Sequence, residues 1–278
     1  MVPSIAVTGS TGRLGGRVAR LLAAAGLGQR LVVRDLSRAP QLPQAEPVQA
    51  GYAAAAAVRI ALRGIDTVLM VSASETPDRV QQHRSFIDAA VEAEVGHLVY
   101  VSFCCAGPSA TFTLARDHGA TEAHIRDSGM AFTFLRDNLY SDFLPSMVGE
   151  DGVIRGPAGH GRVAAVAQDD IAEVAAAVLT SPAAHVGTTY ELTGPQPLTL
   201  DEVAATISAV TGRAVTYRPE TVEEAHASRA GFGAPDWQVD AWVSTYTAIA
   251  AGELATVSDA IPTITGHPAT SLADLLAS

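Results

Sequence analysis

The chain opens on IAVTGSTGRLGGRVARLL, residues 5–22, where a short apolar run passes through several glycines into a helical pattern. Gly9, Gly12 and Gly15 have the spacing TGxxGxxG. Between a strand and a helix, this spacing permits a tight turn, close approach of a pyrophosphate to the backbone, and close packing of helix on strand. The helix N-terminus adds free N–H groups and the positive end of its dipole. We therefore expect this turn to bind a dinucleotide.

Apolar and helical segments alternate along the first half of the chain. The expected strands are 5–8, 30–33, 67–71, 97–101 and 131–135, with helices near 13–25, 54–62, 78–94 and 112–128. Alternation at this spacing is typical of a parallel sheet with helices on both faces. Right-handed crossovers then give an α/β fold of the Rossmann type, a doubly wound parallel sheet.

The pattern changes after residue 135. Residues 136–162 are rich in glycine, proline and aromatic residues, which predicts loops with at most a short helix. Strand 163–167, helix 169–179 and strand 188–192 follow, then a helix capped by Thr199 and Glu202, a strand at 214–217 and a helical remainder. We expect a nucleotide-binding domain over 1–135, its sheet completed by about 163–193. A smaller C-terminal α/β region would comprise 136–162 and 194–278.

Composition and charge restrict the partners. Hydrophobic residues make up 48% and charged residues 17%, enough apolar material for a buried core. A formal net charge of −11 gives no general attraction to nucleic acid or to an anionic membrane. Cys104 and Cys105 are adjacent, and we expect reduced thiols, as in the cytoplasm. No signal peptide, membrane-spanning run or metal-ligand spacing is visible.

The end of the second expected strand bears on which dinucleotide binds. A carboxylate there accepts from the ribose 2′-hydroxyl of NAD, whereas an arginine meets the 2′-phosphate of NADP. The stretch LVVRDLSRAP places Arg34 first, Asp35 next and Arg38 one turn on, and Arg13 adds a cation in the glycine turn. The arginines favour NADP(H), and Asp35 keeps NAD(H) as the alternative.

Further motifs occur in one order along nearly the whole chain. They are VRDxSRA, SxSE at 72–75, QHR at 82–84, HxxTE at 118–122, LRDNLYSDF, GxG[KR] at 159–162, DDIA, YELTG and GHPATSL. With TGxxGxxG they resemble the NmrA-like branch of the atypical short-chain dehydrogenases, most closely its bacterial NADPH:quinone oxidoreductase and triphenylmethane reductase subgroup. The resemblance implies a Rossmann domain that binds NADP(H), a small C-terminal domain closing over the nicotinamide, and a cleft for flat aromatic acceptors.

The resemblance also implies residue roles. Its implied cofactor residues are Gly9, Thr11, Gly12, Arg13, Leu14, Arg34, Ser72, Ala73, Ser74, Ser102, Phe103 and Asn138. The chain departs from relatives in lacking the Tyr-x-x-x-Lys of ordinary short-chain dehydrogenases. It has no lysine at all, since all 18 Lys-or-Arg residues are arginine, and Ala123 stands where quinone-reductase relatives often carry lysine. Quinones accept hydride readily and water supplies protons, so the departure argues mainly against reactions that need a strong positioned acid.

Ser102 and His118 are the catalytic candidates. Ser102 would donate to a substrate oxygen or to the carboxamide, or else cap its strand end. His118 would donate a proton, because imidazole titrates near neutral pH, or else hydrogen-bond to Glu122 four residues on. The substrate-binding candidates are Glu75, Cys104, Tyr140, Phe143 and Trp237. For the aromatic residues core packing is the alternative. Cys104 would be a thiol nucleophile if a partner such as His118 lowered its pKa, or else a small residue that lines the pocket.

Three functions follow from these observations. The leading hypothesis is a cytoplasmic NAD(P)H-dependent oxidoreductase, monomeric or homodimeric, that transfers hydride to a quinone or another flat conjugated aromatic. The second is a monooxygenase-type tailoring enzyme for a polycyclic aromatic polyketide such as an anthrone or hydroquinone. The third is a non-enzymatic NmrA-like redox sensor that binds the oxidised cofactor and a protein partner.

Overall fold

The structure is a computed structural model and describes residues 4–278. These residues separate into two compact units. The first extends to Ser102 and includes Asp117–Arg136 and Gln168–Tyr190; the second contains Phe103–Arg116, Asp137–Ala167 and Glu191–Ser278. The prediction differs in two segments, which lie in the second unit. It assigned residues 103–116 to the nucleotide-binding domain and residues 163–167 to the strands that complete its sheet. The assignment of functional domains stays a prediction.

One seven-stranded sheet forms the centre of the fold. In spatial order its strands run β3-β2-β1-β4-β5-β6-β9, and the pairs from β3 through β5 are parallel. Their bounds are β1 Ile5–Thr8, β2 Gln29–Val33, β3 Ala45–Gln49, β4 Thr67–Val71, β5 His97–Phe103, β6 Ala131–Asp137 and β9 Thr189–Leu192. The order reverses between β1 and β4, which marks the edge where open α/β sheets bind ligands.

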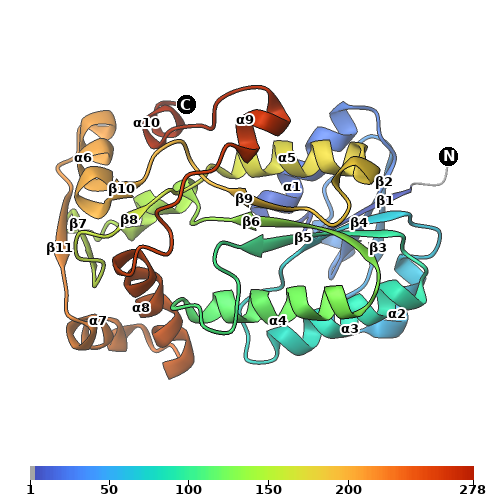
Figure 1. Cartoon of the computed structure of the whole chain (residues 1–278), viewed down its shortest axis with the longest axis horizontal. Helices are drawn as coiled ribbons and strands as arrows, with labels where there is room; N and C mark the ends of the chain where they lie inside the picture. Colours follow the sequence, from blue (N-terminus) through green and yellow to red (C-terminus); the bar gives the residue numbers. More distant parts are fainter. Residues whose placement is uncertain (1–3) are drawn as a thin grey trace. The chain divides into compact units, whose positions relative to one another are not determined.

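Helices cover both faces of this sheet in the first unit. Their bounds are α1 Arg13–Ala24, α2 Ala55–Ala61, α3 Arg79–Glu92, α4 Thr113–Asp127 and α5 Gln168–Thr180, with short 3₁₀ turns η1 Leu36–Arg38 and η3 Pro182–His185. Figure 1 shows α1 beside α5 on one face and α2 beside α3 on the other. The strands β1, β4 and β5 are buried almost throughout, because helices pack on both sides. The predicted Rossmann-type α/β fold is confirmed.

The second unit is built from short elements. Strand β7 (Val153–Gly156) pairs in parallel with β11 (Thr216–Pro219), and β8 (Arg162–Val163) pairs antiparallel with β10 (Leu198–Thr199). Its helices are α6 Leu200–Thr211, α7 Val222–Arg229, α8 Asp236–Ala250, α9 Ala260–Thr265 and α10 Leu272–Ala277, with 3₁₀ turns η2 Ser141–Met147 and η4 Ala230–Phe232. A separate apolar core that includes Leu144, Ile154, Val203 and Ile249 holds them together.

Local expectations are met at the caps and missed at short strands. Thr199 and Glu202 form the predicted capping box, and Thr221 with Glu224 forms a second one. The predicted strand 163–167 was wrong in length, because β8 is only Arg162–Val163 and the following residues make a single bridge at Val166. Strands β3 and β7 were missed. β3 is a half-exposed edge strand containing Pro47, so it lacks the continuous apolar run of a buried strand.

None of the helices among the described residues is both long and apolar enough to cross a membrane. Within the same residues, no group of His, Cys, Asp or Glu side chains is arranged to hold a metal ion.

Candidate functional site

The glycine turn lies between β1 and α1, as the sequence predicts. The N–H of Gly12 donates to the carbonyl of Gly9 over 2.8 Å and closes the turn. Gly9 has φ +64°, and a Cβ on Gly15 would lie 2.5 Å from the Gly9 oxygen. The helix therefore approaches the strand this closely only because Gly15 has no side chain. This small-residue cradle at a helix N-terminus fits a bound pyrophosphate.

A cavity of about 270 Å³ lies at the carboxyl ends of β1, β2 and β4. The predicted cofactor residues that line it are Gly9, Thr11, Gly12, Arg34, Ser72, Ala73 and Ser74. Other lining residues include Val32, Ala50, Tyr52 and Thr76, which the sequence did not single out, and Gln82 of the QHR motif. Three loops distant in sequence thus meet at the edge where the strand order reverses.

Arg34 and Asp35 are neighbours with different surroundings. Arg34 is exposed and lines the cavity, and its carbonyl accepts from the Gln49 amide over 2.9 Å. The Asp35 carboxylate accepts from the Ser37 hydroxyl (2.7 Å) and N–H (2.9 Å), which holds the pKa of Asp35 below its ordinary value. The carboxylate therefore caps η1, and only the cation of this pair lines the cavity. That arrangement suits a 2′-phosphate better than a 2′-hydroxyl.

A closed ring of hydrogen bonds, absent from our predictions, ties the cavity floor together. The Val71 N–H donates to Thr8 Oγ1 over 2.9 Å, and the Tyr52 hydroxyl donates to the Val71 carbonyl over 2.5 Å. Thr8 Oγ1 lies 2.5 Å from Tyr52 Oη and must be the donor there, because the single tyrosine proton is already used. The ring joins the ends of β1 and β4 through Tyr52.

The loop after β4 is held by two buried side chains of α3. The Ala73 N–H donates to His83 Nε2 over 2.9 Å, and the Ala73 carbonyl accepts from Arg79 Nε over 3.1 Å. His83 is fully buried, and its Nδ1 lies 2.8 Å from Thr121 Oγ1. Burial, reinforced by the nearby Arg79 charge, lowers the pKa of His83 to about 3. His83 is therefore neutral, with its proton on Nδ1.

His118 belongs to the same buried network. Its Nε2 accepts from Arg79 over 3.0 Å, so its Nδ1–H donates to the Tyr100 hydroxyl over 2.9 Å. Burial, followed by the charge of Arg79, lowers the pKa of His118 well below its ordinary value. A buried neutral imidazole with both nitrogens occupied is poorly suited to release a proton to substrate at neutral pH.

Ser102 is fixed by a different buried group. Its hydroxyl donates to Glu122 Oε1 over 2.7 Å, at the end of β5. Glu122 in turn accepts from Arg136 (2.7 and 2.8 Å) and from Arg126 (3.1 Å). The carboxylate is 1% exposed and is balanced by two guanidinium groups. The hydroxyl proton of Ser102 is therefore committed to this cluster.

The remaining implied cofactor residues lie outside the cavity lining. Arg13 is exposed at the start of α1, beside the buried Leu14. Phe103 and Asn138 belong to the second unit. The Asn138 amide donates to the Leu254 carbonyl over 3.0 Å, while its oxygen accepts from the Leu139 N–H over 2.8 Å. Their part in cofactor binding stays a prediction.

The substrate-binding candidates are dispersed. Glu75 is exposed in the loop after β4, and Cys104 is buried, which raises the pKa of its thiol and makes it unreactive. The Tyr140 hydroxyl donates to Asp137 over 2.8 Å. Phe143 lines a cavity of the second unit, whereas Trp237 is half-buried and lies outside that lining. Of this group, Phe143 is the member that lines that cavity of the second unit.

Comparison with known proteins agrees with a nucleotide-binding site at the glycine turn. Residues 9–182 match the family described as NAD(P)H-binding. The NAD(P)H azoreductase of Xenophilus azovorans is 36% identical over 276 residues, covering 97% of this chain and 96% of that protein. The chain belongs to the NAD(P)H-binding family.

Solved structures agree over the whole length. The NADPH-dependent quinone oxidoreductase of Escherichia coli, complexed with NADPH, has a TM-score of 0.89 at 33% identity and covers 98% of both chains. The Citrobacter triphenylmethane reductase, complexed with NADP(H), has a TM-score of 0.87 at 32% identity, again over 98% of this chain and 99% of that one. The regulator NmrA matches at 17% identity with a TM-score of 0.79, covering the whole of this chain and 95% of that one, which shows a shared fold alone.

The predicted kinship, NAD(P)H binding and membership of the NAD(P)H-dependent oxidoreductases are confirmed at this level. The relatives at 30% identity or more that are named above are an azoreductase, a quinone oxidoreductase and a triphenylmethane reductase, which does not favour the monooxygenase or the sensor.

Proposed function

We propose that this protein is an NADPH-dependent oxidoreductase that reduces a quinone or a similarly flat, conjugated acceptor by hydride transfer. The observation that carries the proposal is the cavity at the carboxyl ends of β1, β2 and β4. There Arg34 lines the cavity together with Gly9 and Gly12, whereas the Asp35 carboxylate caps η1 by accepting from Ser37. The full-length similarity to an azoreductase, a quinone oxidoreductase and a triphenylmethane reductase supports an aromatic acceptor.

The protein contributes binding and orientation, and the cofactor contributes the redox chemistry. When bound, reduced nicotinamide supplies a hydride, and one proton from water completes the conversion of a quinone to a hydroquinone. The backbone of Gly9–Gly12 holds the pyrophosphate, and Arg34 pairs with the 2′-phosphate. His83 and Arg79 fix both polar groups of the Ala73 peptide, so the loop of Ser72–Ser74 meets the cofactor in one conformation.

Ser102 and His118 are assigned positioning roles in this proposal. Both are buried, and both make hydrogen bonds to charged groups of the protein. A reaction that takes its proton from water needs no acid at either place. This fits a chain without lysine and without Tyr-x-x-x-Lys.

Location and assembly are also proposed. Cys104 and Cys105 form no disulfide, and the net charge is −11. The thiols support a reducing cytoplasm, and the negative charge supports small-molecule rather than nucleic-acid partners. We propose that the chain is a monomer or a homodimer.

The test is an anaerobic assay that mixes the protein, NADPH and the uncharged quinone menadione. Nicotinamide absorbance should fall in step with hydroquinone formation, and NADH should serve poorly. Because oxygen is excluded, a monooxygenase would give no turnover. Absence of NADPH oxidation across a panel of quinones and azo compounds would overturn the proposal.

A further inference from the structure

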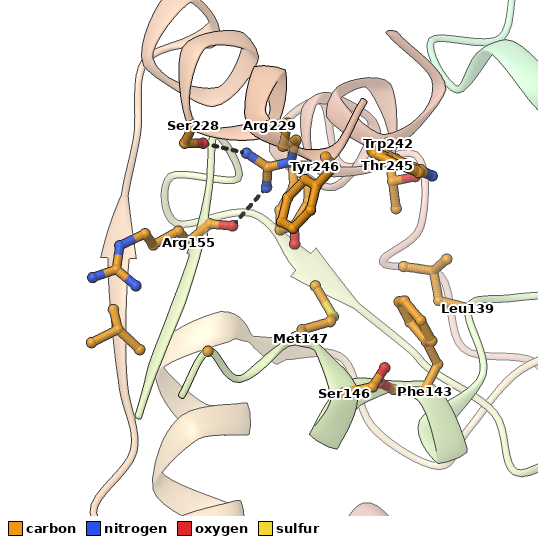
Figure 2. A pocket seen from close by; sticks show the side chains of 13 residues that line it. Leu139, Phe143, Ser146, Met147, Arg155, Ser228, Arg229, Trp242, Thr245 and Tyr246 are labelled. Carbon is orange, nitrogen blue, oxygen red and sulfur yellow. Dashed lines mark hydrogen bonds between the residues drawn. The ribbon is translucent and has the colours of Figure 1, made fainter. Parts of the chain in front are cut away.

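The second unit holds a cavity of about 350 Å³ that no assignment above explains. Its walls come from η2, β7, the end of α7 with η4, and α8, as Figure 2 shows for the labelled residues. Four of its lining side chains are aromatic: Phe143, Phe232, Trp242 and Tyr246. This size and this apolar, aromatic lining are typical of a site for a small fused-ring ligand.

Exposed aromatic side chains are concentrated at this cavity. Phe232 is 73% exposed and Phe143 is 54% exposed. Among the large hydrophobic side chains that the described chain exposes, these two are the aromatic ones, and both line the cavity. Phe232 meets Trp242 edge to face, with ring centroids 6.1 Å apart. A ligand that covers exposed apolar surface in a cavity removes that surface from water, which favours binding.

The charges around the cavity cancel in pairs. Arg229 forms an ion pair with Glu220 at 3.1 Å, and both side chains are nearly buried. Arg229 also donates to the Arg155 carbonyl over 3.0 Å. The Arg155 guanidinium pairs with Asp151 through two contacts, of 2.5 and 3.1 Å, and Figure 2 shows it directed away from the cavity. Neither arginine therefore offers an uncompensated charge to an anionic ligand.

Tyr246 supplies the polar group that remains. Its ring lies so close to β7 that a Cβ on Gly156 would be 2.2 Å from Tyr246 Cδ1. Arg229 covers the ring at 5.1 Å, and Figure 2 shows the hydroxyl pointing away from Arg229 toward Met147. Among the described residues, no acceptor takes its proton. Burial raises the pKa of Tyr246 although Arg229 opposes the rise, so the hydroxyl keeps its proton and can donate.

We propose that this cavity binds the acceptor of the reaction proposed above, an uncharged flat aromatic carbonyl compound, and that the Tyr246 hydroxyl donates a hydrogen bond to its carbonyl oxygen. This inference rests on the proposed function. The paired charges select against sulfonated or carboxylated acceptors, because burying such an anion beside neutralised arginines costs solvation without repayment. Gly156 makes the room that the tyrosine ring needs.

The two tryptophans provide a direct binding test without cofactor. Trp242 lines the cavity and Trp237 does not. Trp237→Phe leaves the cavity tryptophan as the emitter, and menadione should quench its fluorescence saturably. Trp242→Phe leaves the other tryptophan, which should show only linear collisional quenching. A sulfonated naphthoquinone should bind the Trp237→Phe protein at least ~10-fold more weakly, the penalty of an unpaired desolvated charge.

Two further variants, made in the Trp237→Phe background, test the hydrogen bond. Tyr246→Phe keeps the ring and should weaken menadione binding ~2- to 10-fold, the value of one hydrogen bond. Gly156→Ala should weaken it at least as much by displacing the ring. Tyr190→Phe, in the first unit and outside both cavities, is the matched control and should bind as before. Circular dichroism melts confirm that each variant is folded.

Several results would overturn the inference. These are equal quenching of both single-tryptophan proteins, equal binding of the charged and uncharged quinones, or unchanged binding in the folded Tyr246→Phe protein. Concentration-dependent dimerisation that protects Trp242 would assign the cavity to a second copy instead. NADPH oxidation assayed on the same proteins separates the two proposals. Turnover without Trp242 quenching rejects the cavity alone, and saturable quenching without turnover rejects the proposed function alone.

Discussion

The cavity proposed for the cofactor and the cavity proposed for the acceptor differ in what forms their walls. The cavity of the first unit is lined by loops at the carboxyl ends of β1, β2 and β4, and polar side chains such as Thr8, Tyr52 and His83 hold these loops. The cavity of the second unit is lined by aromatic side chains, two of which are largely exposed. A backbone site tolerates little change, whereas an aromatic lining can be altered without loss of fold. Substitutions should therefore act steeply in the first and gradually in the second.

The steepest effect is expected at Gly15. Gly15→Ala places a Cβ 2.5 Å from the Gly9 oxygen, a contact that only backbone movement relieves. Overpacking of this kind costs ~1–3 kcal/mol of unfolding free energy, and the moved turn should lose measurable NADPH affinity. Denaturant unfolding and isothermal titration calorimetry measure the two effects. Gly107→Ala, where the nearest atom is 3.8 Å from an added Cβ, is the control. Wild-type NADPH affinity in Gly15→Ala would contradict the cradle.

Arg34 should contribute the next largest effect. Arg34→Ala removes a charge-assisted contact with the 2′-phosphate and should weaken NADPH binding ~10- to 100-fold while leaving NADH binding unchanged. Titration with both cofactors gives the ratio. Arg38, which is exposed and outside the cavity lining, is the comparison, and Arg38→Ala should change either affinity less than ~3-fold. An equal loss for NADH and NADPH would show that Arg34 does not read the phosphate.

The sequence predicts the first cavity well because its signals are local. The glycine turn and Arg34 stand within or next to single strand–turn–helix units, where spacing alone fixes geometry. Tyr52, Arg79 and His83 were missed as cavity supports, because their roles depend on contacts between segments distant in sequence. Tyr52 contacts the ends of β1 and β4, whereas Arg79 and His83 join the loop after β4 to α4. The QHR motif contained His83, but nothing local shows that its ring meets the Ala73 peptide.

The second cavity is harder to predict because it depends on helix register. Trp242 and Tyr246 are four residues apart on α8 and share the cavity side. Trp237 is five residues before Trp242, about 140° around the helix at 3.6 residues per turn, and so lies off the cavity. Without the helix bounds and its packing partners, an aromatic-rich segment does not reveal which ring lines a cavity. The burial of His118 and its contacts with Arg79 and Tyr100 depend on the same tertiary information, which the sequence does not contain.

His83 should have an intermediate effect that reports on positioning. His83→Ala removes the acceptor of the Ala73 N–H and should raise KM for NADPH ~3- to 10-fold with kcat within ~2-fold. His83→Gln, which can still hydrogen-bond, should recover part of the loss. Steady-state kinetics at saturating menadione measure the split. A fall in kcat with unchanged KM would instead indicate contact with the reacting atoms.

The same residue gives a pH signature. Its folded pKa of about 3 lies below the ordinary 6.5, so the unfolded chain binds the proton first and stability falls as pH drops below 6.5. Between pH 7 and pH 5 this single group should cost about 2 kcal/mol. His83→Gln should therefore lose less unfolding free energy over that interval than the wild type does, by denaturant titration at both pH values. Identical losses would mean that His83 is not buried as a neutral group.

The smallest and most selective effect is expected at Phe232. Phe232→Leu keeps an apolar side chain but removes a ring that is 73% exposed, so unfolding free energy should change by less than ~0.5 kcal/mol. Menadione affinity should fall ~2- to 5-fold with the loss of ring contacts, while KM for NADPH stays constant. Val186→Ala, an exposed site in the first unit outside both cavities, should change neither quantity. A shift in the NADPH constant, or an unfolding cost like that of Gly15→Ala, would remove the contrast between a rigid backbone site and an adjustable aromatic one.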